Sequence, residues 1–202
     1  MATIICVTGK MAAGKNAVCD ILSEKGWFCI DLDVLSHGAL EEAQDCVIAE
    51  FSPENSAILL NDDGKISRKK LAEIVFKNKE NLRRLENILH PVIEKMTLRE
   101  IEKSQSKKIV INATVLYKTN LLSLCSAIIF VDASPILRLI RCRKRNKMKF
   151  SQIFKRFFIQ KDLFSQYSRK NSDIYIVDNS NSLDVLKNNV NTIIENIDTN
   201  GD

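Results

Sequence analysis

The chain has 202 residues, of which 45% are hydrophobic and 27% are charged. This composition is typical of one folded domain and argues against a disordered chain. No apolar run reaches the roughly 18 residues that a membrane-spanning helix needs, and the start of the chain does not resemble a secretory signal. We therefore expect a cytoplasmic protein, with six scattered cysteines present as reduced thiols.

The first residues predict a β-loop-α-β unit. The apolar, β-branched run 3–7 precedes a glycine-containing turn, which is typical of a strand buried on both faces of a parallel sheet. Residues 16–25 carry apolar side chains on one helical face and are followed by Gly26, where a helix C-cap glycine belongs. Residues 27–30 predict a second strand that ends in an Asp-Leu-Asp sequence.

Three more apolar runs, at 109–111, 127–131 and 174–177, predict strands separated by amphipathic helices. The expected fold is therefore α/β, with a five-stranded parallel sheet covered by helices on both faces. Residues 68–103 instead predict helix throughout, interrupted only at Pro91. This insertion between the second and third strands is long enough to form a subdomain.

The sequence from Gly9 to Asn16, GKMAAGKN, fits the phosphate-binding P-loop pattern G-x-x-x-x-G-K. It lies directly after a predicted strand and before a predicted helix, as the motif requires. Such a loop directs backbone N–H groups and a helix N-terminus at phosphates, and Lys15 would reach the outer phosphates of a nucleotide. Asn16 departs from the usual Ser or Thr, although a carboxamide oxygen can also bind Mg²⁺.

A phosphate-binding loop alone does not define the reaction, because pumps, switches and kinases share it. Asp31 and Asp33 are predicted at the carboxyl end of the second strand, on the sheet edge where open α/β sheets bind ligands. A carboxylate there can orient an acceptor hydroxyl and take its proton during phosphoryl transfer.

Residues 141–161 contain nine Lys or Arg and no Asp or Glu. Such a run can be a solvated helix face, a nucleic-acid patch or a lid over a polyanionic substrate. Because a P-loop kinase needs a lid that excludes water, we favour the lid. Apolar residues at helical spacing predict that one face of this segment packs on protein; they are Phe150, Ile153, Phe154, Phe157 and Phe158.

The chain resembles the dephospho-coenzyme A kinase family in several separated segments. The family's P-loop, roughly T-G-G-I-G-S-G-K-S, aligns with residues 8–16, and its D-A-D sequence aligns with residues 31–33. Its L-x-x-I-V-F block after an Arg resembles residues 68–76, and its L-E-x-I-x-H-P block resembles residues 85–91.

Later segments continue the resemblance in the same order. The family's two arginines four residues apart fall on Arg141 and Arg145, and its R-I-x-x-Q block falls on residues 156–160. A strand that ends in Asn near the adenine looks like residues 174–179.

This resemblance implies a P-loop NTPase-type three-layer fold with ATP and Mg²⁺ as donor and metal. The core would comprise about residues 1–35, 105–140 and 170–202, the helical CoA-binding insertion about 36–104, and the lid about 141–169. The reaction implied is ATP-dependent phosphorylation of the ribose 3′-hydroxyl of dephospho-CoA, without nucleic-acid or membrane partners.

The resemblance also assigns roles to individual residues. Asp33 would be the general base, with Lys15, Arg141 and Arg145 stabilising the transferring phosphoryl charge. The predicted nucleotide-binding residues are Gly9, Ala12, Ala13, Gly14, Lys15, Asn16, Ala17 and Asn179. The predicted substrate-binding residues are Asp33, Arg68 and His90, although His90 near the end of an apolar helix can instead have a structural role. His37 is a further candidate because it follows Asp33 by one helical turn, with a simple surface histidine as the alternative. Asn16 is the candidate metal ligand.

Three positions depart from the family pattern. Asn16 replaces a hydroxyl, while Asn112 and Lys118 stand where the family's D-x-P-x-L-F-E segment has acidic residues. Fewer anionic ligands favour weaker metal binding. Besides an active kinase, the sequence therefore leaves open a catalytically weakened nucleotide- or CoA-binding protein and a kinase for another small hydroxyl acceptor.

Overall fold

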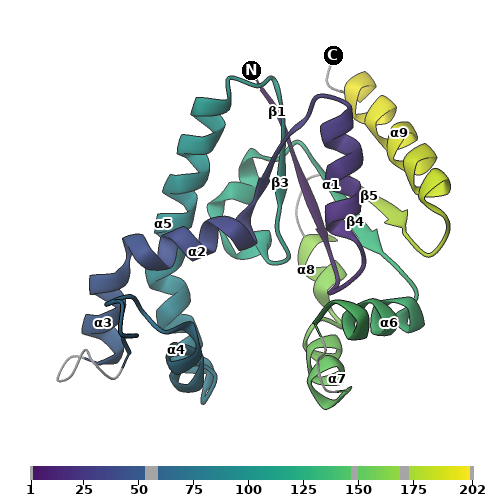
Figure 1. Ribbon diagram of the computed structural model, residues 1–202. Coiled ribbons are helices and arrows are strands. Elements are labelled where there is room, and N and C mark those ends of the chain that lie inside the picture. Colours follow the sequence, from purple (N-terminus) through teal and green to yellow (C-terminus); the bar gives the residue numbers. More distant parts are fainter. Residues whose placement is uncertain (1, 53–58, 147–149, 169–172, 201–202) are drawn as a thin grey trace. The chain divides into compact units, whose positions relative to one another are not determined.

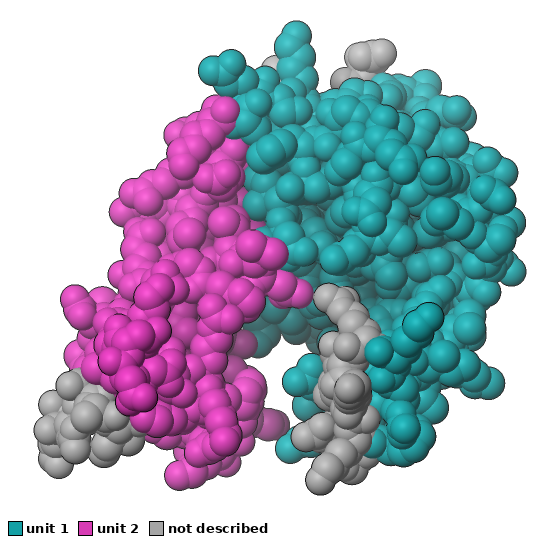
Figure 2. All heavy atoms as spheres, in the orientation of Figure 1, with its two compact units in different colours: residues 1–31, 104–202 teal, residues 32–103 magenta. Residues whose placement is uncertain are grey.

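The structure is a computed structural model that describes residues 2–52, 59–146, 150–168 and 173–200. It divides into two compact units (Figure 1 and Figure 2), one formed by residues 1–31 and 104–202 and the other by residues 32–103. Among the residues that the structure describes, every helix is too short or too polar to cross a bilayer.

The first unit contains a five-stranded parallel sheet in the order β2-β3-β1-β4-β5, which confirms the predicted strands. The strands are β1 (Thr3–Gly9), β2 (Phe28–Asp31), β3 (Lys108–Asn112), β4 (Ala127–Asp132) and β5 (Asp173–Asp178). β1 is central and pairs with both β3 and β4, so the loop that follows β1 emerges in the middle of the carboxyl edge.

Two helices cover one face of this sheet. α1 (Lys15–Glu24) and α9 (Leu183–Asn200) pack side by side (Figure 1), and their buried side chains share one core with alternate residues of the strands. In α1 these are Val18, Ile21 and Leu22, on the predicted apolar face, together with Cys19. Gly26 ends the α1 turn at φ +83°, where a residue without Cβ avoids the left-handed penalty.

The opposite face of the sheet is covered by shorter elements. They are two 3₁₀ turns, η2 (Leu116–Lys118) and η3 (Asn120–Leu124), together with α8 (Leu163–Ser168). Phe130 of β4 meets Phe164 of α8 edge to face at 5.1 Å between ring centroids. α6 (Pro135–Asn146) and α7 (Phe150–Ile159) complete this unit, and residues 147–149 and 169 of the predicted lid lie outside the described residues.

The expectation about α7 is only partly correct. Ile153 is fully buried, but Phe150, Phe154 and Phe158 are exposed. These three recur at a spacing of four and form their own stripe on the helix. Cations lie over two of the rings, Arg143 over Phe150 and Lys161 over Phe158, which gives the stripe favourable contacts without burial.

The second unit is helical. It contains α2 (Leu32–Glu42), α3 (Gln44–Phe51), α4 (Arg68–Val75) and α5 (Lys79–Ser104), and its core includes Val47, Leu59, Leu71 and Val75. β2 is a short edge strand that ends at Asp31, and Asp33 follows directly in the first turn of α2.

The predicted interruption at Pro91 is wrong, because α5 continues through this proline. The break falls instead between α4 and α5, at residues 76–78. Asn78 explains it: its side-chain oxygen accepts the backbone N–H of Asn81 at 2.7 Å and so begins a new helix. Asn81 in turn donates to the carbonyl of Ile74 at 3.2 Å, near the end of α4.

Replacing Asn78 with Ala should lower the free energy of unfolding by about 1 kcal/mol, because an amide at the start of α5 loses its cap. Asn189, an exposed residue within α9, provides the control, where Ala should leave stability unchanged or slightly raised. Urea denaturation of both variants measures the effect. An equal loss in the two variants would show that the cap contributes nothing specific.

Candidate functional site

The loop after β1 has the backbone of a phosphate-binding turn. Gly9, Ala12 and Gly14 all have positive φ, at 152°, 61° and 105°. A Cβ on Gly9 would overlap the carbonyl oxygen of Val131, and one on Gly14 would overlap the side-chain nitrogen of Asn179. Glycine is therefore favoured at both positions by conformation, and at Gly9 also by contact with a backbone atom, whereas a Cβ at Gly14 would displace the side chain of Asn179.

Side chains from α6 and from the end of β5 hold two carbonyls of this loop. Arg138 Nε donates to Met11 O at 2.9 Å, while Arg141 Nη1 and Asn179 Nδ2 donate to Ala13 O at 3.2 and 2.8 Å. In a trans peptide the carbonyl and the following N–H point in opposite directions. The N–H groups of Ala12 and Gly14 therefore face away from these side chains.

The first turn of α1 adds further donors. Gly14 precedes the helix and has no side chain to cap it. The amides of this turn, with the positive end of the helix dipole, are thus directed at the space that the loop surrounds. A cavity of about 360 Å³ lies at the loop, and its volume is within the usual range of ligand sites. Its lining comprises Met11, Ala12, Gly14, Lys15, Asn16, Arg141, Cys142 and Lys144.

Lys15 is positioned by the residue two places after β3. Its Nζ donates to Thr114 Oγ1 at 3.0 Å. The carbonyl of Thr114 in turn accepts from Thr8 Oγ1 at 3.3 Å and from the hydroxyl of the buried Tyr167 at 3.1 Å. Burial raises the pKa of that hydroxyl, so Tyr167 stays neutral and keeps donating.

The start of the loop makes hydrogen-bond contact with the predicted lid, at Gln160 just after α7. The side-chain oxygen of Gln160 accepts the N–H of Met11 at 2.7 Å, and Arg138 stacks on Phe157 of α7 at 4.1 Å from the ring centroid. Arg138 is only 5% exposed, and one of its nitrogens, Nη2, lacks a hydrogen-bond partner within the described part of the chain. Burial lowers the pKa of its guanidinium, although Asp132 opposes this shift.

Three polar side chains meet where β2, β3 and α1 approach one another. Asn112 Nδ2 donates to Asp31 Oδ2 at 3.1 Å and to Asn16 Oδ1 at 3.3 Å. Asn112 is buried and its Oδ1 finds no partner among the described residues, a cost of about 1–3 kcal/mol for an amide oxygen. Asn16 is exposed and faces the cavity.

This oxygen-rich corner fits Mg²⁺ bound mainly through phosphates. Within the described ranges, no group of three His, Cys, Asp or Glu side chains could hold a metal by itself. Mg²⁺ commonly takes one or two protein oxygens, with waters and substrate phosphates as its other ligands. The amide oxygen of Asn16 and the carboxylate of Asp31 supply oxygens of the right kind.

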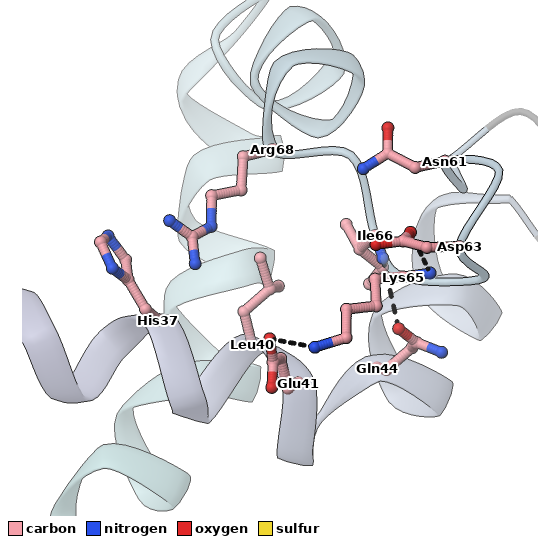
Figure 3. Close-up of a pocket in the computed structure, with 9 residues that line it drawn as sticks. All are labelled: His37, Leu40, Glu41, Gln44, Asn61, Asp63, Lys65, Ile66 and Arg68. Carbon is pink, nitrogen blue, oxygen red and sulfur yellow. Dashed lines mark hydrogen bonds and ion pairs between the residues drawn. The ribbon is translucent and has the colours of Figure 1, made fainter.

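The predicted substrate residues lie in the second unit. His37 and Arg68 line one cavity of about 310 Å³ (Figure 3), and Arg68 extends its guanidinium toward the side where His37 lies. A turn at residues 61–65 closes part of it, with Lys65 paired to Glu41 at 3.0 Å. His90 lies half-buried in α5 and is not among the residues that line this cavity.

The structure thus gathers the predicted nucleotide-binding residues, Asn179 included, around one loop together with the predicted catalytic residue Arg141, and it gathers His37 and Arg68 around another cavity. Arg145 belongs to α6, but its side chain lies outside the described residues. Sequence reasoning missed Thr114 and Arg138. Arg138 had a usable signal, because it stands three residues before Arg141 and shares its helical face.

Replacing Gly14 with Ala should weaken ATP binding at least about tenfold, because the new Cβ displaces Asn179 and frees the Ala13 carbonyl. Gly26 offers a matched control, since it also has positive φ but nothing lies within 4 Å of its missing Cβ. Ala at position 26 should cost about 1 kcal/mol of stability and leave ATP affinity unchanged. Calorimetric titration with ATP measures the affinity of the two variants. Equal affinities for ATP in the two variants would contradict the role of Gly14.

Comparison with known proteins agrees with this geometry. A family model described as dephospho-CoA kinase matches residues 3–184. A dephospho-CoA kinase of Treponema pallidum is 33% identical over 197 residues, which cover 95% of this chain and 93% of the relative. A dephospho-CoA kinase of Treponema denticola is 35% identical over 182 residues, which cover 87% of this chain and 82% of the relative.

Solved structures share the fold. A dephospho-CoA kinase from Campylobacter jejuni superposes with a TM-score of 0.62 at 27% identity, covering 97% of both chains. A Thermus thermophilus protein superposes with a TM-score of 0.80 at 22% identity, covering 96% of this chain and 97% of that one, and supports the fold alone. By the family model and the relatives together, the chain belongs to the dephospho-CoA kinase family, whose members are transferases with ATP as phosphoryl donor.

Proposed function

We propose that the chain transfers the γ-phosphoryl group of ATP to the ribose 3′-hydroxyl of dephospho-CoA, giving CoA and ADP. The observation that carries this proposal is the loop before α1, whose amides and Lys15 face one cavity in a chain that matches the family over residues 3–184. The donor phosphates would bind there by backbone N–H groups and the helix dipole.

Lys15 and Arg141 would offset the negative charge of the transferring group. Both line the loop cavity, and Thr114 holds the Lys15 amine at 3.0 Å. Arg141 also donates to Ala13 O and, at 2.9 Å, to Asn179 O, so its charge sits at the loop wall. Preorganised charges of this kind stabilise a phosphoryl transition state without reorganisation. Roles for Arg145 in charge stabilisation and for Asn179 at the adenine stay predictions.

Mg²⁺, when bound, would neutralise charge on the ATP phosphates, with Asn16 as a ligand. Asp33 would take the proton of the acceptor hydroxyl. Its exposed carboxylate lies in the first turn of α2. The cavity lined by His37 and Arg68 would bind an anionic part of dephospho-CoA. His90, which does not line this cavity, would make a separate contact with the substrate.

The first test is to mix the purified chain with ATP, Mg²⁺ and dephospho-CoA and to follow ADP and CoA together by mass spectrometry. Equal amounts of the two products support the proposal. ADP without CoA would show that the phosphoryl group passes to water and not to the ribose 3′-hydroxyl, which contradicts the proposal. ATP binding by calorimetry with neither product would point to the catalytically weakened binding protein that the sequence left open.

Replacing Asp33 with Asn should lower kcat at least about a hundredfold, because the base is lost, while ATP affinity stays within twofold. Asp20, exposed on α1, is the matched control, and its change to Asn should leave kcat unaltered. Single-turnover kinetics separate chemistry from product release. Full turnover in the Asp33 variant would exclude this carboxylate as the base.

Replacing Arg68 with Ala should raise KM for dephospho-CoA about tenfold or more, the usual loss of a charge-assisted hydrogen bond, with KM for ATP unchanged. The exposed neighbour Lys69 tests whether charge alone matters, since its change to Ala removes the same charge outside the cavity lining. Equal effects from both variants would argue for a general field and against a contact from Arg68.

A further inference from the structure

One buried amide connects the ends of two neighbouring strands with the start of α1. Asn112 ends β3, and its side-chain nitrogen donates to Asp31 Oδ2 at 3.1 Å and to Asn16 Oδ1 at 3.3 Å. The sheet register pairs Asp31 with Asn112, so the two side chains are held side by side by backbone hydrogen bonds. Asn112 is 5% exposed, which keeps water from competing for its bonds.

Asp31 determines the direction of both hydrogen bonds. An ionised carboxylate only accepts, so it selects the NH₂ side of the Asn112 amide. The second hydrogen of that nitrogen faces Asn16 and selects the oxygen of its amide. Asn112 Oδ1 is left without a partner among the described residues because the carboxylate prevents the amide from turning round.

We propose that Asn112 is a positioning residue that aims the amide oxygen of Asn16 as the loop's ligand for the divalent cation that accompanies ATP. The proposal rests on the proposed function only in taking Mg·ATP as the molecule bound at the loop. Asn16 is exposed to the loop cavity and stands where P-loops carry a Ser or Thr hydroxyl for Mg²⁺.

The chemistry explains why both positions are amides. A hydroxyl donates through its hydrogen and can still offer lone pairs to a cation, so a serine at position 16 tolerates a carboxylate at position 112. An asparagine has separate donor and acceptor ends. Opposite a carboxylate, Asn16 would turn its NH₂ group toward position 112, and its oxygen would leave the place where Asn112 now holds it. An amide at position 16 therefore requires a donor at position 112.

A four-protein cycle tests this coupling: the unchanged chain, Asn16→Ser, Asn112→Asp and the double variant. Calorimetry gives the Kd of ATP with Mg²⁺ and with EDTA, and the ratio of the EDTA value to the Mg²⁺ value measures what the cation contributes. We expect Asn112→Asp to lower this ratio about tenfold when Asn16 is present, the usual effect of losing an outer-shell partner. In the Asn16→Ser background, the same change should restore or raise the ratio.

The alternative is a simple effect of charge, in which an added carboxylate strengthens cation binding equally whichever residue stands at position 16. A ratio that changes in the same direction in both backgrounds overturns the proposal. Formation of CoA by the unchanged chain is measured separately. CoA formation together with an uncoupled cycle refutes the positioning role and leaves the proposed function standing.

Asn112→Asp places a second carboxylate beside Asp31 and can unfold the chain, so the melting temperature of each variant is recorded. Asn112→Ala provides a second contrast, since it removes the amide without adding charge. It should lower the ratio about tenfold beside Asn16 and leave it within twofold in the Asn16→Ser background. Equal losses in both backgrounds, which a purely structural role would produce, contradict the proposal.

Discussion

The candidate site depends on two backbone carbonyls of the loop that are held facing the side chains of α6 and Asn179. Met11 O and Ala13 O accept hydrogen bonds from Arg138, Arg141 and Asn179. Because each peptide unit is planar, fixing a carbonyl also fixes the N–H on its other side. The amides that would contact phosphate are thus oriented before a ligand binds, and little ordering of the loop is left for binding to supply.

This arrangement has a cost in stability. Arg138 is almost fully buried, its pKa is lowered by burial, and one of its nitrogens has no partner within the described residues. Replacing a buried charge by apolar groups is often neutral or stabilising, so folding alone does not account for an arginine here. Its hydrogen bond to Met11 O and its stacking on Phe157 connect the loop to α7, and this connection accounts for an arginine at this position.

Much of this arrangement could be predicted from the sequence, because the signals are local. The five strands are short apolar runs, and the loop follows a spacing that only a phosphate-binding turn requires. Errors arose where a nearby side chain overrode a residue's usual tendency. Asn78 starts a new helix at a place that has no proline, while Pro91 lies inside α5.

The missed contacts share a different cause. Thr114 and Arg138 act through partners that are 99 and 127 residues away in the chain, so no spacing rule brings them together. Only the strand order, with β1 between β3 and β4, places their elements beside the loop. The prediction that the apolar face of α7 packs on protein was partly wrong for a related reason. Helical periodicity shows which residues share a face but not what covers that face.

The amides at positions 16 and 112 also change the electrostatics of the loop. Lys15, Arg141 and Lys144 line the cavity, whereas Asn16 and Asn112 are neutral and Asp31 is the carboxylate bonded to Asn112. A carboxylate at either position would attract the cation but repel the phosphates that carry it. In the proposed complex with Mg²⁺ and ATP, neutral oxygens would reduce that repulsion. A small set of protein ligands for the cation would be sufficient only if each were correctly oriented, and in our proposal the hydrogen bonds of Asn112 would set that orientation for Asn16.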